Sequence, residues 1–328
     1  MYAVLRHCLR SCESRSSGNC TNSKKRVRGF TPATPLVATP DCVYDRPVTG
    51  DLVILTGTSS GIGLAAALEC AASGFRVVAT MRNLDRRAPL LDAATARGVK
   101  IDVEQLDVTS DSAPARVREL ILKYGPPYGL VNNAGIAVGG PFEEQSDRDT
   151  RDQFETNVFG LMAMTRAVLP AMRAASRGRI VNISSLSGRV GFPLVSVYAA
   201  TKHAVEGLSE ALRWEVEPFG IDVCLIEPGT HKTPIFFENQ RRGELLDKSG
   251  PYAAFCDRIE ALMIRSAERA NPPDSVGRAI ARVLREPSPP FRTLVGADAM
   301  ALTTLRRALP DWLFATGLRR LVQTSRLR

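Results

Sequence analysis

The sequence predicts an α/β fold, a doubly wound parallel sheet of the Rossmann type in a single domain. From Asp51 onward, short apolar runs alternate with longer helical patterns, which is typical of a parallel sheet covered by helices on both faces. A glycine-rich turn follows the first apolar run and opens a helical pattern, as in dinucleotide-binding folds. The strands are expected at 52–55, 75–80, 99–106, 128–131, 179–184, 221–227 and 291–295.

The first expected strand is followed directly by Thr-Gly-Thr-Ser-Ser-Gly-Ile-Gly at 56–63. Glycines let the backbone approach a pyrophosphate closely, and the helix N-terminus offers free N–H groups and the positive end of its dipole. A tight loop without a ligand is the alternative for an isolated glycine turn, but the place of this one between strand and helix favours a cofactor site. Its expected cofactor-binding residues are Gly57, Thr58, Ser59, Ser60, Gly61, Ile62 and Gly63.

Helical patterns separate the later strands, most clearly at 62–73, 147–173 and 198–217. The segment at about 230–271 interrupts this alternation and mixes charges with apolar side chains. The apolar residues are Phe236, Phe237, Tyr252, Phe255, Leu262 and Met263. A segment of this length inside a compact domain is usually functional. We expect a lid with helices of its own, and a plain surface insertion is the alternative.

The two ends of the chain differ from the body at 49–298, which we interpret as the dinucleotide-binding catalytic domain. Residues 1–48 lack hydrophobic periodicity and indicate a disordered extension. Their composition also suits an organellar transit peptide, or a start codon placed too far upstream. Residues 299–328 predict an amphipathic helical tail broken at Pro310. Packing on the domain or covering the substrate pocket is favoured there over contact with a membrane surface.

The formal net charge of +9 is concentrated at the two ends of the chain. Residues 1–40 contribute +6 and residues 301–328 contribute +5, which leaves the body nearly neutral at −2. A nucleic-acid partner is therefore not expected, because it would need a basic surface on the body. No apolar run approaches the ~20 residues that a membrane-spanning helix requires.

The seven cysteines show no CxxC spacing of a zinc site. Cys70 and Cys224 lie in apolar segments, which indicates reduced, buried thiols and a cytoplasmic location. His203 and His231 have no metal-ligand partners at suitable spacing, so we expect no metal and interpret both as ordinary polar residues.

Tyr198 and Lys202 are four residues apart in a helical pattern, so both side chains are expected on one helix face. A free tyrosine has a pKa near 10 and is a poor base at neutral pH. A neighbouring cation favours the phenolate, and we expect Lys202 to lower the pKa of Tyr198 into a range useful for acid–base catalysis. The spacing alone also fits a solvated helix face, and the surrounding motifs favour a catalytic pair.

The end of the second expected strand, Ala-Thr-Met-Arg-Asn at 79–83, indicates the choice of cofactor. Folds of this kind that prefer NAD place an acidic residue here to bind the ribose hydroxyl. This stretch has none, and Arg82 can pair with a 2′-phosphate. Ser59 could add a hydroxyl. We therefore expect NADP(H), and an Arg82 that is merely solvated is the alternative.

These motifs make the chain resemble the short-chain dehydrogenase/reductase family over roughly 51–295. The matches follow the family's order: Thr-Gly-x3-Gly-Ile-Gly at 56–63, Asn-Asn-Ala-Gly at 132–135, Ser185 thirteen residues before Tyr198, and the Tyr198-x3-Lys202 pair. Asn157, in the run Thr-Asn-Val-Phe-Gly, matches the family's fourth catalytic residue.

The resemblance implies a role for each of the four catalytic candidates. Tyr198 would exchange a proton with the carbonyl or alcohol oxygen, and Lys202 would lower its pKa and bond the nicotinamide ribose. Ser185 would hydrogen-bond the developing alkoxide. Asn157 would hold a water that links Lys202 to solvent. The hydride would come from the cofactor.

The resemblance also implies further cofactor contacts. Asp107 and Asn133 match positions on the adenine side. The family places the turn Glu-Pro-Gly-x3-Thr beside the nicotinamide, and this turn is matched at 227–233. The remaining residues implied in this way are Ala134, Gly135, Pro228, Gly229 and Thr233.

Within the family, the chain looks like the branch that acts on steroids and retinoids. This implies a small hydrophobic carbonyl or alcohol as substrate. A 3-oxoacyl thioester reductase is the alternative, and a non-catalytic NADPH-binding scaffold is disfavoured because all four catalytic candidates are present. Family members are often homo-oligomers, and we expect the same here.

Overall fold

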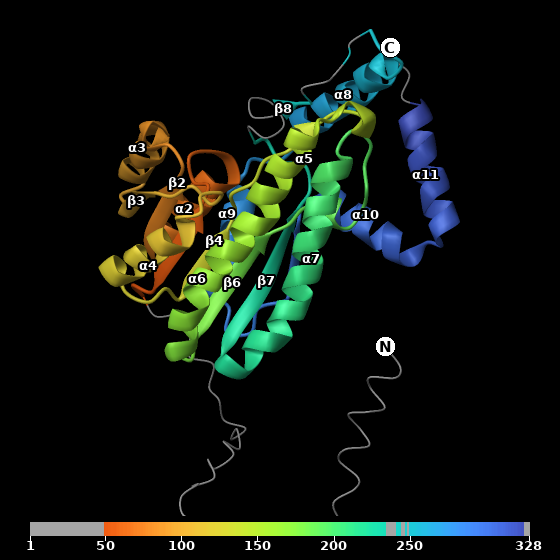
Figure 1. Cartoon of the computed structure of the whole chain (residues 1–328). Coiled ribbons are helices and arrows are strands. Elements are labelled where there is room, and N and C mark those ends of the chain that lie inside the picture. The colour runs from red at the N-terminus through yellow and green to blue at the C-terminus, as the bar shows by residue number, and fades with distance from the viewer. Residues whose placement is uncertain (1–48, 234–240, 244–246, 248, 325–328) are drawn as a thin grey trace, which may run out of the picture. The chain divides into compact units, whose positions relative to one another are not determined.

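The computed structural model describes residues 49–233, 241–243, 247 and 249–324 (Figure 1). Within this part of the chain, seven parallel strands form one sheet in the order β3-β2-β1-β4-β6-β7-β9. The expected doubly wound parallel sheet is therefore confirmed. The strands are β1 (Leu52–Thr56), β2 (Arg76–Met81), β3 (Ile101–Gln105), β4 (Gly129–Asn132), β6 (Gly178–Ile183), β7 (Ile221–Pro228) and β9 (Arg292–Val295).

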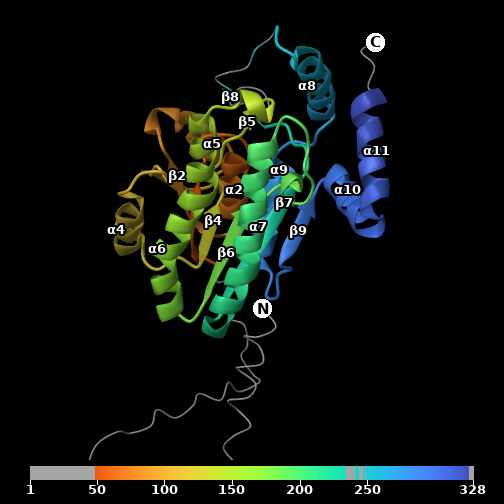
Figure 2. The same ribbon diagram turned by 45° about the vertical axis from the view of Figure 1, so that its right-hand side comes forward.

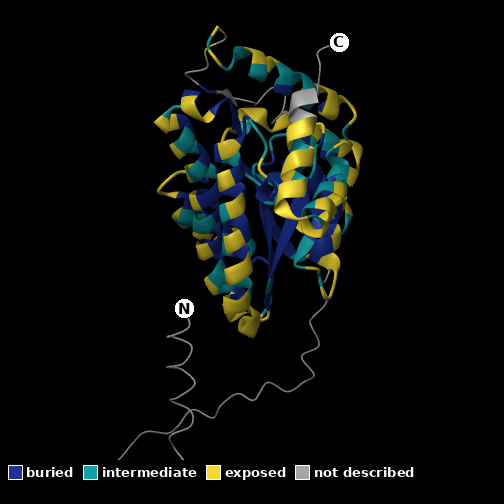
Figure 3. Cartoon of the chain, turned by 90° about the vertical axis from the view of Figure 1, so that its right-hand side faces the viewer, coloured by how far each residue is buried: buried dark blue, intermediate teal, exposed yellow. Residues whose placement is uncertain are grey.

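The central strands β1 and β4 are buried along their whole length, on both faces of the sheet, whereas the edge strand β3 is only partly buried. Side chains alternate between the faces along a strand. In β1, Val53 and Leu55 belong to one apolar core, and Leu52 and Ile54 belong to a second core on the other face. Burying each such side chain contributes roughly 1.5–3 kcal/mol. Figure 3 shows the strands as a buried interior, with exposed residues on the outer faces of the helices.

Helices cover both faces of the sheet (Figures 1 and 2). One face packs against α2, α3 and α9, and the other against α4, α6 and α7. Their bounds are α2 (Gly61–Ala72), α3 (Ala88–Ala96), α4 (Ala113–Tyr124), α6 (Leu161–Ala174), α7 (Ser196–Val216) and α9 (Asp274–Arg285). The carboxyl ends of the parallel strands meet at one edge, where ligands bind in folds of this class.

The helix expected at 147–173 is divided into three segments. It begins as α5 (Asp147–Phe154), continues as a π-helical turn at Glu155–Gly160, and resumes as α6. The helical pattern expected at 147–173 is therefore observed, with a π-helical turn that the pattern did not indicate. Gly160 leaves room for Val108, whose Cγ2 would lie 2.9 Å from a Cβ at this position. Single π-helical turns occur frequently at functional sites, and this one contains Asn157.

The segment at 230–271 contains one helix in its described part, α8 (Ala253–Glu268). A two-residue strand, β8 (Arg241–Arg242), pairs in parallel with β5 (Val138–Gly139). Phe236 and Phe237 lie outside the described residues, as does the expected extension at 1–48. A lid function for this segment stays a prediction.

The C-terminal region forms α10 (Ala297–Ala308) and α11 (Asp311–Thr324), which meet at Pro310. The expected break in the tail is thus observed. Helix α10 buries Ala299 and Thr303, whereas no residue of α11 up to Arg320 is buried. Among the described helices, none is both long enough and apolar enough to cross a membrane.

Candidate active site

The carboxyl ends of the strands surround a cavity of about 720 Å³. The sequence-predicted residues converge on it from turns after β1, β2, β3, β4, β6 and β7 and from α7. Those that line it are Gly57, Ser59, Ser60, Gly61, Ile62, Gly63, Arg82, Asp107, Asn133, Ala134, Gly135, Ser185, Tyr198, Lys202, Pro228, Gly229 and Thr233. Thr58 and Asn157 do not line the cavity.

The glycine turn after β1 requires glycine for close packing as well as for access to a ligand. Gly57 has φ +69°, and a Cβ there would lie 2.8 Å from Ala134 Cα. Gly61 has φ +57°. A Cβ on Gly63 would lie 2.1 Å from the Gly57 carbonyl oxygen. A side chain at Gly57 or Gly63 would displace the turn from Asn133 and Ala134, which follow β4.

Two threonines and Asn133 hold the glycine turn in place. Thr56 Oγ1 accepts hydrogen bonds from the backbone N–H groups of Asn133 and Ala134, each at 3.0 Å. Asn133 Nδ2 donates to the carbonyls of Thr56 and Gly57, each at 2.9 Å. The buried Thr58 donates through Oγ1 to the Thr80 carbonyl at 3.1 Å. Thr58 therefore supports the turn from behind and has no access to the cavity.

Asn157 links the π-helical turn to the segment after β4 and to α7. Its Oδ1 accepts from the Ile136 N–H at 2.8 Å, and its Nδ2 donates to the Ile136 carbonyl at 2.9 Å. The same Nδ2 lies 3.0 Å from Thr201 Oγ1. Thr201 is the neighbour of Lys202, so Asn157 is connected to Tyr198 and Lys202 through α7.

Ser185, Tyr198 and Lys202 meet at the centre of the cavity. Ser185 follows β6 and accepts a hydrogen bond from the Ser187 N–H at 3.1 Å. Tyr198 and Lys202 lie one turn apart on α7, with Lys202 Nζ 5.6 Å from the centre of the Tyr198 ring. Lys202 Nζ also donates to the Ile183 carbonyl at 2.8 Å. The expected shared helix face is therefore observed.

Burial shifts both pKa values in the direction that favours the neutral side chain. It raises the pKa of Tyr198 to about 12, and a hydrogen bond with Ser185 acts in the opposite direction. Burial also lowers the pKa of Lys202 to about 8, opposed by the negative charge of Glu206. The pKa of Tyr198 therefore lies above its usual value, opposite to the direction expected from Lys202, because desolvation outweighs the hydrogen bond with Ser185.

The far end of the cavity contains two arginines and one carboxylate. Arg82 and Arg86 both line it, and neither forms an ion pair within the described residues. Asp107 Oδ1 accepts hydrogen bonds from the backbone and the hydroxyl of Thr109, at 3.0 and 2.8 Å. Sequence reasoning missed Arg86, although a second arginine four residues after Arg82 could have indicated it.

The turn after β7 is held by residues that sequence reasoning also missed. Asp298, in the first turn of α10, accepts from the Thr230 N–H at 2.7 Å. A Cβ on Gly229 would lie 2.1 Å from the same carboxylate, so only glycine fits there. His231 is buried, lines the cavity and hydrogen-bonds Ser275 Oγ through Nε2 at 3.1 Å. His231 is thus a buried anchor of this turn.

An apolar cluster joins α8 to the segment between Ser185 and Tyr198. Leu194 belongs to that segment and has φ +64°, which leucine rarely adopts. The other members lie in α8 or directly before it. They include every apolar residue expected in the lid that lies within the described part of the chain. They are Tyr252, Phe255, Cys256, Ile259, Leu262 and Met263.

Comparisons with known proteins agree with this geometry. The family model described as short chain dehydrogenase matches residues 51–243. A 3-ketodihydrosphingosine reductase of Bacteroides thetaiotaomicron is 36% identical over 269 residues, which cover 82% of this chain and 96% of that protein. Retinol dehydrogenase 8 of Homo sapiens is 35% identical over 264 residues, covering 77% of this chain and 84% of that protein. The expected resemblance to a retinol dehydrogenase-like branch is confirmed.

Solved structures share the fold. A short-chain dehydrogenase from Streptomyces avermitilis is 32% identical with a TM-score of 0.71, covering 85% of this chain and 100% of that chain. A metagenomic short-chain oxidoreductase in complex with NADP is 26% identical with a TM-score of 0.60, covering 76% and 97%. A Burkholderia phymatum enzyme in complex with NAD is 26% identical with a TM-score of 0.67, covering 79% and 93%.

Proposed function

Because this chain belongs to the short-chain dehydrogenase family of oxidoreductases, we propose that it interconverts a carbonyl and an alcohol on a hydrophobic substrate with NADP(H). The observation on which this rests most is the convergence of Ser185, Tyr198 and Lys202 on the cavity that the glycine turn also lines. A proton donor, a hydroxyl for the substrate oxygen and a cation thus face the space beside a dinucleotide-type turn.

The residues present fit a nicotinamide dinucleotide. The glycine turn leaves no room for a Cβ at Gly57 or Gly63 and opens α2, whose first residues, Gly61, Ile62 and Gly63, line the cavity. The residues from Gly57 to Gly63 would hold the pyrophosphate, and Lys202 would hold the nicotinamide ribose. When bound, the cofactor supplies or accepts the hydride.

Tyr198 supplies the proton in this scheme. With its pKa raised to about 12 by burial, the phenol is protonated at neutral pH and can donate to a carbonyl oxygen. Ser185 donates a hydrogen bond to the same oxygen as negative charge develops on it. The phenolate left on Tyr198 is stabilised by the charge of Lys202. In the reverse direction Tyr198 must first be a phenolate, stabilised by the charge of Lys202, and it then accepts the alcohol proton.

Arg82 and Arg86 support a preference for NADP(H). Both line the cavity beyond the end of β2, where an acidic residue would favour NAD. Residues 79–83 contain no Asp or Glu, so nothing there repels a 2′-phosphate. Two guanidinium groups can form charge-assisted hydrogen bonds with that phosphate. One similar structure contains NADP and another contains NAD, so the relatives do not distinguish the two cofactors. The preference for NADP(H) therefore rests on the two arginines.

The proposed substrate is a bulky apolar ketone, aldehyde or alcohol. Two relatives support this, a retinol dehydrogenase and a 3-ketodihydrosphingosine reductase, because the substrates that their names give have long hydrocarbon portions. The apolar cluster between α8 and Leu194 supports it as well, because it adjoins the segment that connects Ser185 to Tyr198.

The test is a screen of NADPH oxidation against all-trans-retinal, a steroid ketone, a long-chain 3-ketosphingoid base and a 3-oxoacyl thioester. We expect turnover of at least one of the first three, with little turnover of the thioester. A preference for the thioester would favour an acyl thioester reductase. No turnover of any carbonyl, in protein that binds NADPH, would contradict the proposed function.

A further inference from the structure

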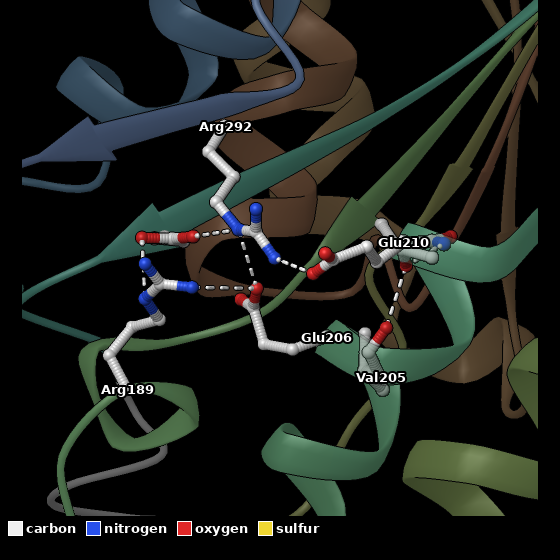
Figure 4. Close-up of polar contacts among 8 residues, drawn as sticks. Arg189, Val205, Glu206, Glu210 and Arg292 are labelled. Carbon is white, nitrogen blue, oxygen red and sulfur yellow. Dashed lines mark hydrogen bonds and ion pairs between the residues drawn. The ribbon is translucent and has the colours of Figure 1, made fainter. Parts of the chain in front are cut away.

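Two arginines and two glutamates from four different segments form a charged cluster beside the candidate active site (Figure 4). Arg292 Nε on β9 donates to Glu206 Oε2 on α7 at 3.0 Å and lies 3.3 Å from Glu227 Oε1 on β7. Arg189, just after the 3₁₀ turn at 186–188, lies 3.7 Å from Glu206 Oε2 and 4.0 Å from Glu227 Oε2. We refer to Arg189, Glu206, Glu227 and Arg292 as the Arg–Glu cluster.

Stability alone does not explain the Arg–Glu cluster. The side chains of Glu206 and Glu227 are only 8% and 1% exposed. The Oε1 atom of each has no hydrogen-bond partner within the described residues. Burial, and then the neighbouring Glu206, raise the pKa of Glu227. Buried ion pairs of this kind often stabilise a fold no more than apolar residues of similar volume do.

Glu206 lies one helical turn beyond Lys202, on the same face of α7. Its negative charge opposes the effect of burial on the pKa of Lys202. A Cβ on Gly188 would lie 2.6 Å from Ser184 Oγ, 3.2 Å from Glu206 Cγ and 3.2 Å from the Lys202 carbonyl oxygen. The chain next to Ser185, the backbone of Lys202 and the side chain of Glu206 therefore meet at one point.

The other carboxylate of the cluster lies at the cofactor side of the cavity. Glu227 is followed directly by Pro228 and Gly229, both of which line the cavity. Glu206 and Glu227 approach the same two guanidinium groups. The Arg–Glu cluster thus connects α7, which contains Tyr198 and Lys202, to the end of β7.

We propose that Glu206 is a positioning residue for the reaction: fixed by Arg292 and Arg189 on the same face of α7 as Lys202, its carboxylate supplies the negative charge that keeps Lys202 an ammonium ion. This rests on the proposed function, in which Lys202 is the cation beside Tyr198. Glu206 itself does not line the cavity, so it acts through Lys202 and does not contact the substrate.

The charges around Lys202 determine in which direction its pKa should move when the charge of Glu206 is removed. On α7 it faces Tyr198 and Glu206, and on β6 it faces the Ile183 carbonyl. Glu206 in turn faces the guanidinium groups and the carboxylate of its own cluster. Removing the charge of Glu206 leaves burial unopposed, so Lys202 loses its proton at a lower pH. A neutral Lys202 stabilises the phenolate less, and the decline of activity at alkaline pH should move to lower pH.

The experiment compares Glu206→Gln with Glu210→Gln as the matched control. Glu210 is on the same helix and also pairs with Arg292, at 2.7 Å, but its side chain is 60% exposed and lies a further turn from Lys202. The first readout is the pKa of Lys202, followed by NMR on the full chain labelled with ¹³C at lysine Cε. The chain has seven lysines, and the Lys202 signal is assigned by its absence in Lys202→Arg. The second readout is the pH profile of kcat/KM.

We expect the pKa of Lys202 to fall by about one pH unit in Glu206→Gln, the size typical of losing one nearby opposite charge. The alkaline limb of kcat/KM should move by the same amount, and Glu206→Asp should restore it. Glu210→Gln should match the wild type in both readouts. An unchanged Lys202 pKa in folded Glu206→Gln, or an equal change in Glu210→Gln, would overturn the proposal.

Two further outcomes separate this inference from the proposed function and from a folding defect. If the wild type reduces no carbonyl, the proposed function fails, while the NMR titration still decides whether Glu206 keeps Lys202 charged. If Glu206→Gln does not fold, Glu227→Gln replaces it. That variant leaves both guanidinium groups to Glu206 alone, so the pKa of Lys202 should fall by a smaller amount. An unchanged value there would overturn the proposal.

Discussion

At the scale of the residue, Tyr198 and Lys202 are a pair in which burial opposes both charges. The phenol has a pKa of about 12 and the ammonium a pKa of about 8. At neutral pH the phenol therefore holds its proton and Lys202 is mostly charged, which suits proton donation to a carbonyl oxygen. The charge on Lys202 becomes useful at the moment the phenolate forms, because a cation is then already in place beside it.

Arg82 and Arg86 give the residue-scale prediction on cofactor choice. If both guanidinium groups bind the 2′-phosphate, Arg82→Ala and Arg86→Ala should each weaken NADPH binding about 10- to 100-fold, as expected for losing one charge-assisted hydrogen bond of about 1.5–3 kcal/mol. NADH binding should change little. Fluorescence titration of the two dinucleotides measures this directly.

Arg87→Ala is the matched control for that measurement. Arg87 is exposed and adjacent to Arg86, but it does not line the cavity. We expect wild-type affinity for both dinucleotides in this variant. Equal losses for NADPH and NADH in the Arg82 and Arg86 variants would mean that neither residue distinguishes the phosphate.

The sequence predicts residues of this site when a short motif contains them, and misses those that the fold brings in from a distance. Ser59, Ser185 and Tyr198 belong to local patterns with fixed spacing. Thr56 begins the glycine motif, but its hydrogen bonds to the segment after β4 belong to no local pattern, and neither does the contact of Asp298. Thr56 binds backbone groups 77 and 78 positions later in the chain, and Asp298 binds the N–H of a residue 68 positions earlier. No periodicity or spacing encodes such contacts.

At the scale of the element, the glycine turn and α2 are fixed by contacts between backbones. The strand and the turn could be predicted because apolar runs and glycines are local signals. The π-helical turn at 155–160 could not, because one wider turn leaves the apolar pattern on either side nearly unchanged. Its cause is tertiary, since Asn157 binds both backbone groups of Ile136.

At the scale of the element, replacing Gly63 or Gly207 with alanine should change the stability of the protein in opposite directions. Both are helical, but a Cβ on Gly63 meets the Gly57 carbonyl at 2.1 Å, whereas one on Gly207 meets nothing within 4 Å. Gly63→Ala should destabilise the protein by about 1–3 kcal/mol and abolish NADPH binding. Gly207→Ala should stabilise it by roughly 0.5–1 kcal/mol, the difference in helix propensity. Urea unfolding with a parallel NADPH titration measures both, and two variants that change stability alike would refute this packing of the turn.

At the scale of the whole molecule, the C-terminal region contributes to the site through α10 and much less through α11. Asp298 joins the start of α10 to the turn after β7, and Ala299 is fully buried. Through Arg320, α11 exposes every residue at least in part. The sequence placed the boundary of the catalytic domain at 298, but the described contacts extend the domain through α10, because Thr303 is buried as well.

Two truncations test this division. A chain that ends at Leu309 should keep the melting temperature and NADPH affinity of the full chain, because it retains Asp298 and all of α10. A chain that ends at Gly296 should bind NADPH more weakly and melt earlier, because the turn at Gly229–Thr230 loses its carboxylate anchor. Equal behaviour of both truncations would show that α10 does not support the site.

The central claim is that Tyr198 donates the proton in a nicotinamide-dependent carbonyl reduction, and Tyr198→Phe tests it most directly. The substitution removes one hydroxyl and keeps the ring. With the best carbonyl from the screen, we expect kcat to fall by about 10²–10⁴-fold, the usual contribution of a general acid, while the dissociation constant of NADPH stays within about twofold. A variant that binds NADPH normally and keeps wild-type turnover would contradict the account.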